Sequence, residues 1–244
     1  WCHHHSRLQL GGELAHMNTY ELVAQTQRNG QVESQHFGTV VGLNADGSVA
    51  FSVGDPTAIV FPRSSIKPLQ ATAMVEAGLT LPPRLLALAC ASHDGRPEHL
   101  AGAKEILATA GLDESSLGNL IDYPLDDTER ERAIRDGKQR TSLQMNCSGK
   151  HASMLATCVA AGWPTDKSYL SAEHALQQHI TNMIPSLAGE SAAHIGVDGC
   201  GAPAHAISLI GLARAFRTIA TAAAGTAAHQ VAQAMTSHPL MVGG

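Results

Sequence analysis

Aromatic residues, long apolar runs and an excess of positive charge are all missing or scarce in this chain of 244 residues. Aromatic side chains make up only 4% of the sequence, so we expect a core of small aliphatic side chains and closely packed helices. The formal net charge of −5 argues against nucleic acid or an anionic membrane as a partner. No apolar run reaches the roughly 18 residues that a membrane-spanning helix needs.

Cysteine is also sparse, with five in the chain. Cys2 lies in a His-rich stretch, and residues 1–16 are predicted to be the remnant of an expression tag. The other four are widely spaced, which predicts no disulfide framework and favours a reducing, cytoplasmic location. Cys90 and Cys158 fall in apolar helical sequence and are predicted to be core residues. Residues 17–244 are enough for one large domain or two small ones.

The domain begins with strand-like patterns and continues with helical ones. Turn residues at 29–30 and 44–47 predict a three-stranded antiparallel meander between Tyr20 and Gly54. One late strand is predicted over 194–197. Helices are predicted over 67–78, 97–110, 128–136, 148–161, 172–184, 204–215 and 227–237. Strands first and helices afterwards predict an α+β fold. The last residues have the composition of a loop, so we expect the domain to be incomplete at its C-terminus.

The most informative stretch is Ser64-Ser65-Ile66-Lys67, between an apolar strand-like run and a helix. Ser64 and Lys67 are three residues apart, so on a helix they share one face. A partly desolvated lysine can be neutral and can take the proton of a serine hydroxyl. That is the Ser-Lys variant of nucleophilic catalysis. The spacing alone is common, and Ser64 as a helix cap with a solvated Lys67 is an equally simple interpretation.

Three more segments combine reactive residues with glycine at junctions between regular elements: residues 91–95, 145–151 and 197–203. Their glycines would let backbone N–H groups approach a ligand, as an oxyanion hole requires. Each also has a purely structural interpretation. The segment at 91–95 and Asp198-Gly199 could be ordinary turns, and Cys147 could be a buried, inert thiol.

Cys147, Lys150 and Cys200 raise the question of a metal site. Two thiolates suit zinc, but a lysine ligand must be neutral. Removing its proton near neutral pH costs on the order of 4–5 kcal/mol, so these residues by themselves argue against the site. Cys147 as a nucleophile with His151 as its base, at spacing i,i+4, is a further possibility.

Taken together and in this order, the four segments resemble the asparaginase II family, of the class 3 type typified by Rhizobium enzymes. The similarity extends over nearly everything after Met17, so the resemblance implies a single catalytic domain over residues 17–244 that is incomplete at its C-terminus. It implies a fold like that of serine β-lactamases and penicillin-binding proteins, with an antiparallel sheet and flanking helices. It also implies a homodimer that hydrolyses L-asparagine to L-aspartate and ammonia.

The resemblance assigns roles to individual residues. Ser64 would be the nucleophile and Lys67 its base. Cys147, Lys150 and Cys200 would bind zinc, with a water as the fourth ligand, which overrules the argument from the residues alone. The residues expected to contact substrate are Arg63, Ser92, Asp94 and Asp198.

Two departures from the family pattern leave alternatives open. The pattern often has a second serine where this chain has Asp94, and members continue for roughly another hundred residues. The second Ser-Lys tandem of the family is therefore in doubt here. The alternatives are a related serine amidohydrolase, of glutaminase or β-lactamase type, and a truncated homologue that binds a ligand without turning it over.

Overall fold

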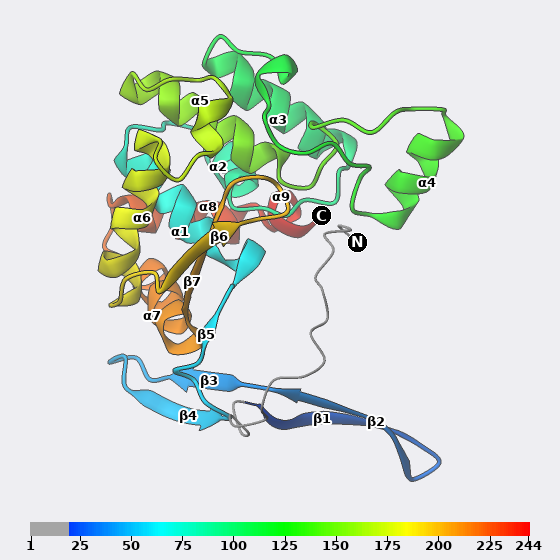
Figure 1. The fold of residues 1–244 in the computed structure, drawn as a ribbon, viewed down its shortest axis with the longest axis vertical. Coiled ribbons are helices and arrows are strands. Elements are labelled where there is room, and N and C mark those ends of the chain that lie inside the picture. Colours follow the sequence, from blue (N-terminus) through cyan, green and yellow to red (C-terminus); the bar gives the residue numbers. More distant parts are fainter. Residues whose placement is uncertain (1–19) are drawn as a thin grey trace.

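Two β-ribbons lie at one end of a helical body (Figure 1). The structure is a computed structural model that describes residues 20–244, so the predicted tag remnant at 1–16 lies outside the described residues. In the first ribbon β1 (Glu21–Arg28) pairs antiparallel with β2 (Gln31–Gly38). In the second, β3 (Val40–Leu43) pairs antiparallel with β4 (Val49–Val53).

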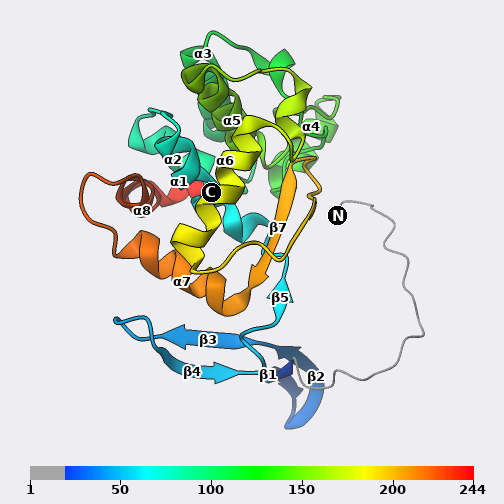
Figure 2. The same cartoon turned by 60° about the vertical axis from the view of Figure 1, so that its left-hand side comes forward.

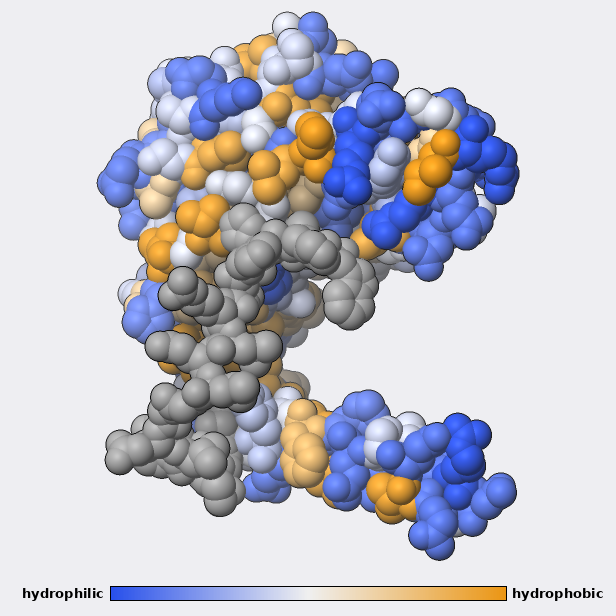
Figure 3. Space-filling model, turned by 45° about the vertical axis from the view of Figure 1, so that its right-hand side comes forward, coloured by the Kyte–Doolittle hydropathy of each residue, from blue (hydrophilic) through white to orange (hydrophobic). Residues whose placement is uncertain are grey.

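The predicted three-stranded meander is therefore wrong. The long middle strand is divided near Thr39, and its two halves pair with different partners. The turn at Asn29-Gly30 folds β1 back on the first half, and both turn residues have the positive φ that this hairpin needs. Both ribbons are largely exposed, and Figure 3 shows hydrophobic side chains among hydrophilic ones on their surface.

A third sheet connects the ribbons to the helical body (Figure 2). Its order is β5 (Ile59–Val60), β7 (Pro203–Ser208), β6 (His194–Val197), with both pairs antiparallel. The helix predicted over 204–215 is thus wrong in its first half. Every residue of β7 is buried, and a fully buried strand lacks the alternation that marks a strand in sequence. The helix begins only after Ser208, whose side chain caps it.

Helices make up the rest of the domain. They are α1 (Lys67–Glu76), α2 (Pro83–Ala89), α3 (Pro97–Thr109), α4 (Asp127–Arg135), α5 (Ser148–Ala161), α6 (Ala175–Ala188), α7 (Leu209–Ala220), α8 (Ala227–Ser237) and α9 (Pro239–Gly243). The prediction for α5 and α8 is confirmed to the residue. α6 is displaced from the predicted 172–184, because it starts after a cap at His174 and ends at Gly189 in the left-handed conformation.

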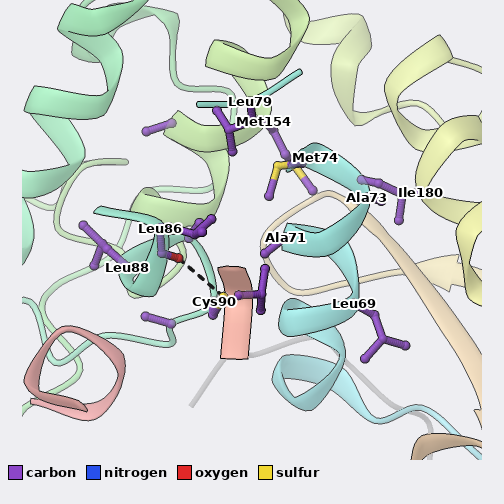
Figure 4. Close-up of a cluster of buried hydrophobic side chains, with 14 of the residues drawn as sticks. Leu69, Ala71, Ala73, Met74, Leu79, Leu86, Leu88, Cys90, Met154 and Ile180 are labelled. Atoms are coloured by element: carbon purple, nitrogen blue, oxygen red, sulfur yellow. Dashed lines mark hydrogen bonds between the residues drawn. The ribbon is translucent and has the colours of Figure 1, made fainter. Parts of the chain in front are cut away.

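The core consists of small aliphatic side chains, as the low aromatic content predicts (Figure 4). α1 lies in its centre, in contact with α2, α5, α6 and α8. Eight consecutive residues of α1, from Lys67 to Met74, are buried. A helix covered on all sides carries any polar residue at its start into the interior, and this is how the fold buries Lys67.

The architecture is mixed, with small antiparallel sheets beside helices, as the sequence predicts. The likeness to serine β-lactamases and penicillin-binding proteins stays a prediction. Within residues 20–244 no helix has the length and apolar character to cross a membrane.

Candidate active site

Ser64 and Lys67 are connected through a third residue, Ser92. Ser64 lies in the short 3-10 turn Arg63–Ile66, and Lys67 is the first residue of α1. The Lys67 Nζ donates to the Ser92 Oγ at 2.6 Å and also to the Ala91 carbonyl oxygen. The Ser92 Oγ in turn lies 2.7 Å from the Ser64 Oγ. The result is a continuous path of hydrogen bonds from a buried amine to an exposed hydroxyl.

The loop after α2 places Ser92 there. Its backbone is tied to the segment before α5, because the His93 N–H donates to the Asn146 carbonyl at 3.1 Å. The His93 Nε2 lies 2.8 Å from the Ser148 Oγ, the first residue of α5. Three of the four segments identified in the sequence therefore meet at this point.

The surroundings of Lys67 disfavour its protonated form. It is 1% exposed. Burial lowers its pKa, and the positive charge of Lys150 acts in the same direction, while Cys147 and Cys200 oppose the shift. A lysine with a lowered pKa is partly neutral nearer to physiological pH, as a general base must be.

Cys147, Lys150 and Cys200 also come together, next to Lys67. Cys147 directly precedes α5, Lys150 lies in its first turn, and the Lys150 Nζ is 3.2 Å from the Cys200 Sγ. A hydrogen bond from Cys200 lowers the pKa of Cys147 to about 5, with help from Lys67 and Lys150. The same hydrogen bond raises the pKa of Cys200. Cys147 is thus the more acidic of the two thiols, and both lie beside two lysines.

Two of these three residues have the chemistry of zinc ligands. Cys147, directly before α5, and Cys200, in the turn after β6, supply sulfur, which zinc prefers, and Lys150 supplies an amine, which can bind a metal only when it is neutral. Burial alone would lower the pKa of Lys150, but the charges of Cys200 and Cys147 raise it overall. Metal binding would therefore have to displace protons from this group. Within residues 20–244 no three His, Cys, Asp or Glu side chains form a metal cluster, so the set depends on Lys150 as a ligand.

Arg63 and Asp198, two predicted substrate contacts, form an ion pair with each other. The Arg63 Nε lies 2.7 Å from the Asp198 Oδ1. Arg63 has a φ of 53°, a conformation that non-glycine residues rarely adopt and that often marks a functional site. Asp198 also accepts from the Cys200 Sγ at 3.8 Å. The pair therefore bridges the turn that holds Ser64 and the turn that holds Cys200.

Asp94, the fourth predicted substrate contact, is oriented toward other partners. Its carboxylate lies 3.3 Å from the Arg96 Nη2, and its carbonyl accepts from the Asp126 N–H at 3.0 Å. The second hydroxyl of the site is supplied by Ser92, two residues earlier. A second hydroxyl thus lies beside Ser64, but the second Ser-Lys tandem of the family stays untested.

Tyr169 is a residue of the site that sequence reasoning misses. It is fully buried, and its hydroxyl lies 2.8 Å from the His151 Nδ1. Burial lowers the pKa of His151 to about 4, so this imidazole is neutral at physiological pH. The one signal in the sequence is the scarcity of aromatic residues, which makes each tyrosine worth examining. A tyrosine that is fully buried needs a hydrogen-bond partner for its hydroxyl.

Comparison with known proteins completes this description. A family model described as L-asparaginase II matches residues 24–244. A search of curated proteins gave no match.

Proposed function

The chain belongs to the L-asparaginase II family, and from this premise we propose that it hydrolyses L-asparagine to L-aspartate and ammonia with Ser64 as nucleophile. One observation carries the mechanism: the path from the Lys67 Nζ through the Ser92 Oγ to the Ser64 Oγ. Ser64 is the exposed end of this path and Lys67 its buried end. Substrate can therefore reach the hydroxyl, while the amine stays desolvated.

Proton transfer would follow this path in two directions. A neutral Lys67 takes the proton of Ser92 as Ser92 takes the proton of Ser64, and the Ser64 Oγ attacks the side-chain amide carbon. The bond from that carbon to nitrogen then breaks, and the proton returns along the path so that ammonia leaves. Water hydrolyses the resulting aspartyl ester and regenerates Ser64.

The ion pair between Arg63 and Asp198 suits a zwitterionic substrate. The guanidinium would bind the α-carboxylate of asparagine and the carboxylate its α-amino group, each in exchange for the present partner. The exposed position of Arg63 favours such an exchange, because an ion pair in contact with water is weak.

Zinc is the proposed cofactor, held by Cys147, Lys150 and Cys200, with water as a further ligand. When bound, it would fix the turn at Cys200 against α5. No proton transfer in the proposed mechanism passes through it. A homodimer stays a prediction from the family resemblance, and a cytoplasmic location stays a prediction from the sparse cysteines.

The decisive experiment compares Ser64→Ala with Ser65→Ala in an ammonia-release assay on asparagine. Both are neighbouring, exposed serines, but only Ser64 is bonded to Ser92. We expect Ser64→Ala to lose activity by about a thousandfold or more and Ser65→Ala to keep most of it. Full activity in Ser64→Ala would refute the nucleophile assignment.

The substrate is tested separately, with asparagine, glutamine and a chromogenic β-lactam offered to the same protein. Asparagine and glutamine differ by one methylene, which a pocket distinguishes by only about 1–3 kcal/mol. We expect asparagine to give the highest kcat/KM. Binding of asparagine without turnover of any of the three would support the non-catalytic alternative.

A further inference from the structure

His93 and His99 are two fully buried histidines that the proposed mechanism does not use. His93 follows Ser92 directly in the loop after α2, and His99 lies in the first turn of α3. Their rings pack against each other, with centroids 5.3 Å apart and planes tilted by 34°. Histidine is costly in a core, because its ring nitrogens lose their contact with water, so a buried pair of histidines requires an explanation.

His93 is attached to the segment before α5 through both its backbone and its side chain. Its N–H donates to the Asn146 carbonyl at 3.1 Å, and its Nε2 lies 2.8 Å from the Ser148 Oγ. Ser92 precedes it, and the Ser92 hydroxyl is the middle of the proposed proton path. Because the two residues are adjacent in the chain, the position of His93 limits where the Ser92 hydroxyl can lie.

The loop is also held on the other side of His93. The Asp94 carbonyl accepts from the Asp126 N–H at 3.0 Å. Gly95 has a φ of 86°, and a Cβ there would come within 2.7 Å of the Pro124 side chain, so glycine is needed for this close approach. These contacts restrict the backbone after His93, so the placement of Ser92 depends on how the His93 side chain is seated in the core.

His99 holds the His93 ring from the side of α3 and α9. Its Nε2 lies 2.8 Å from the Leu240 carbonyl oxygen, and a carbonyl can only accept, so the Nε2–H donates and α9 orients the ring. α9 lies close to α3 here, since a Cβ at Gly102, one turn after His99, would meet the Met241 side chain at 3.3 Å. α9 also contacts α2, the helix that leads into the loop of Ser92.

We propose that His99 is a positioning residue: oriented by α9, its ring keeps His93 seated and thereby keeps the Ser92 hydroxyl in the proton path. His99 acts through His93 and has no direct part in the chemistry. A displacement of about 1 Å at a reacting group can cost about a hundredfold in rate, because proton transfer needs hydrogen-bond distances. The inference rests on the proposed function, in which Ser92 carries the proton between Lys67 and Ser64.

The first test compares kcat for ammonia release from asparagine in two backgrounds. His99→Leu removes both the ring and the N–H donor, and we expect kcat to fall by about tenfold to a hundredfold with little change in KM. In a Ser92→Ala background the same substitution should cause no further loss, because the hydroxyl that it positions is gone. A purely structural role would lower activity equally in both backgrounds.

His174→Leu is the matched control. His174 is also buried, and its Nε2 also lies at hydrogen-bond distance, 3.1 Å, from a backbone carbonyl oxygen, that of Pro164. This variant should lose stability as His99→Leu does, but it should keep the kcat of wild type. If His99→Leu does not fold, His99→Gln takes its place with the same expectations, because it keeps an N–H donor for α9 but has no ring against His93.

The second test is amide hydrogen exchange measured by mass spectrometry, which does not depend on activity. In His99→Leu the amides of residues 91–95 should exchange faster than in wild type, whereas in His174→Leu their exchange should not change. If the wild-type protein released no ammonia from asparagine, the proposed function would fail, and exchange in residues 91–95 would still decide the role of His99.

Three results would overturn the proposal. The first is a kcat in His99→Leu within about twofold of wild type. The second is a loss of kcat as large in the Ser92→Ala background as in the wild-type background, and the third is unchanged exchange of residues 91–95 in His99→Leu.

Discussion

Lys67 and Lys150 are buried to the same degree on two helices in contact, yet their pKa values move in opposite directions. Burial lowers the pKa of Lys67, whose hydrogen-bond partners are a carbonyl oxygen and a hydroxyl. The pKa of Lys150 is raised, because the charges of Cys200 and Cys147 outweigh burial. Removal from water therefore does not by itself make a lysine a base. The partners of each lysine decide whether it can act as a base. Lys67 lies on the serine side of the site, with Ser64 and Ser92, and its pKa is lowered. Lys150 lies on the sulfur side, with Cys147 and Cys200, and its pKa is raised.

Among the variants that test this comparison, Lys67→Met should lose the most activity. It removes the only base that the proposed mechanism uses, so we expect ammonia release to fall by about a thousandfold or more. The methionine fills a similar volume without an amine to desolvate, so the free energy of unfolding should not decrease much. Steady-state kinetics and urea unfolding measure the two effects. Activity within tenfold of wild type would assign the base to another group.

Ser92→Ala should have the next largest effect. It breaks the path between Lys67 and Ser64 but leaves both of them in place. We expect kcat to fall by about a hundredfold with little change in KM, because the loss falls on proton transfer. Ser142→Ala, a serine bonded to a loop carbonyl elsewhere, is the control. A rise in KM with unchanged kcat would show instead that Ser92 binds substrate, as the sequence predicts.

Ser92 also shows where prediction from sequence stops. Ser64 and Lys67 could be selected because a spacing of three is a local, helical relation. The structure replaces their direct contact with a hydroxyl from 25 residues further along, brought there by the packing of α2 and by the contact of His93 with Ser148. Such contacts depend on tertiary structure, which no local spacing encodes.

The same limit applies to prediction of the fold, where local patterns succeed and tertiary contacts are missed. α5 and α8 were predicted to the residue because their helical patterns are continuous and end in clear stop signals. β7 was mistaken for a helix because a strand buried on both faces shows no alternation. The meander failed because hairpin turns identify neighbouring strands but not which half of a long strand each one pairs with.

Lys150→Met should reduce activity less than the two variants above, because it acts on the serine side only through the pKa of Lys67. The positive charge of Lys150 lowers the pKa of Lys67, so its removal should raise that pKa and leave less of the neutral base at neutral pH. In metal-free protein we expect activity near pH 7 to fall by about tenfold and the rising limb of the kcat/KM profile to move to higher pH. Lys104→Met, on the exposed face of α3, should leave the profile unchanged. A limb that stays in place would mean that the two lysines do not interact.

Asp198→Asn should have the smallest effect on stability, although Asp198 connects the two sides. Its ion pair with Arg63 joins the turn before Ser64 to the turn at Cys200, but the Arg63 side chain is 60% exposed. Exposed pairs contribute at most about 1 kcal/mol, and an asparagine can still accept from the Gly199 N–H. We therefore expect the free energy of unfolding in urea to fall by less than about 1 kcal/mol, while KM for asparagine rises. A much larger loss of stability, with KM unchanged, would mean that the ion pair holds the two turns together and does not bind substrate.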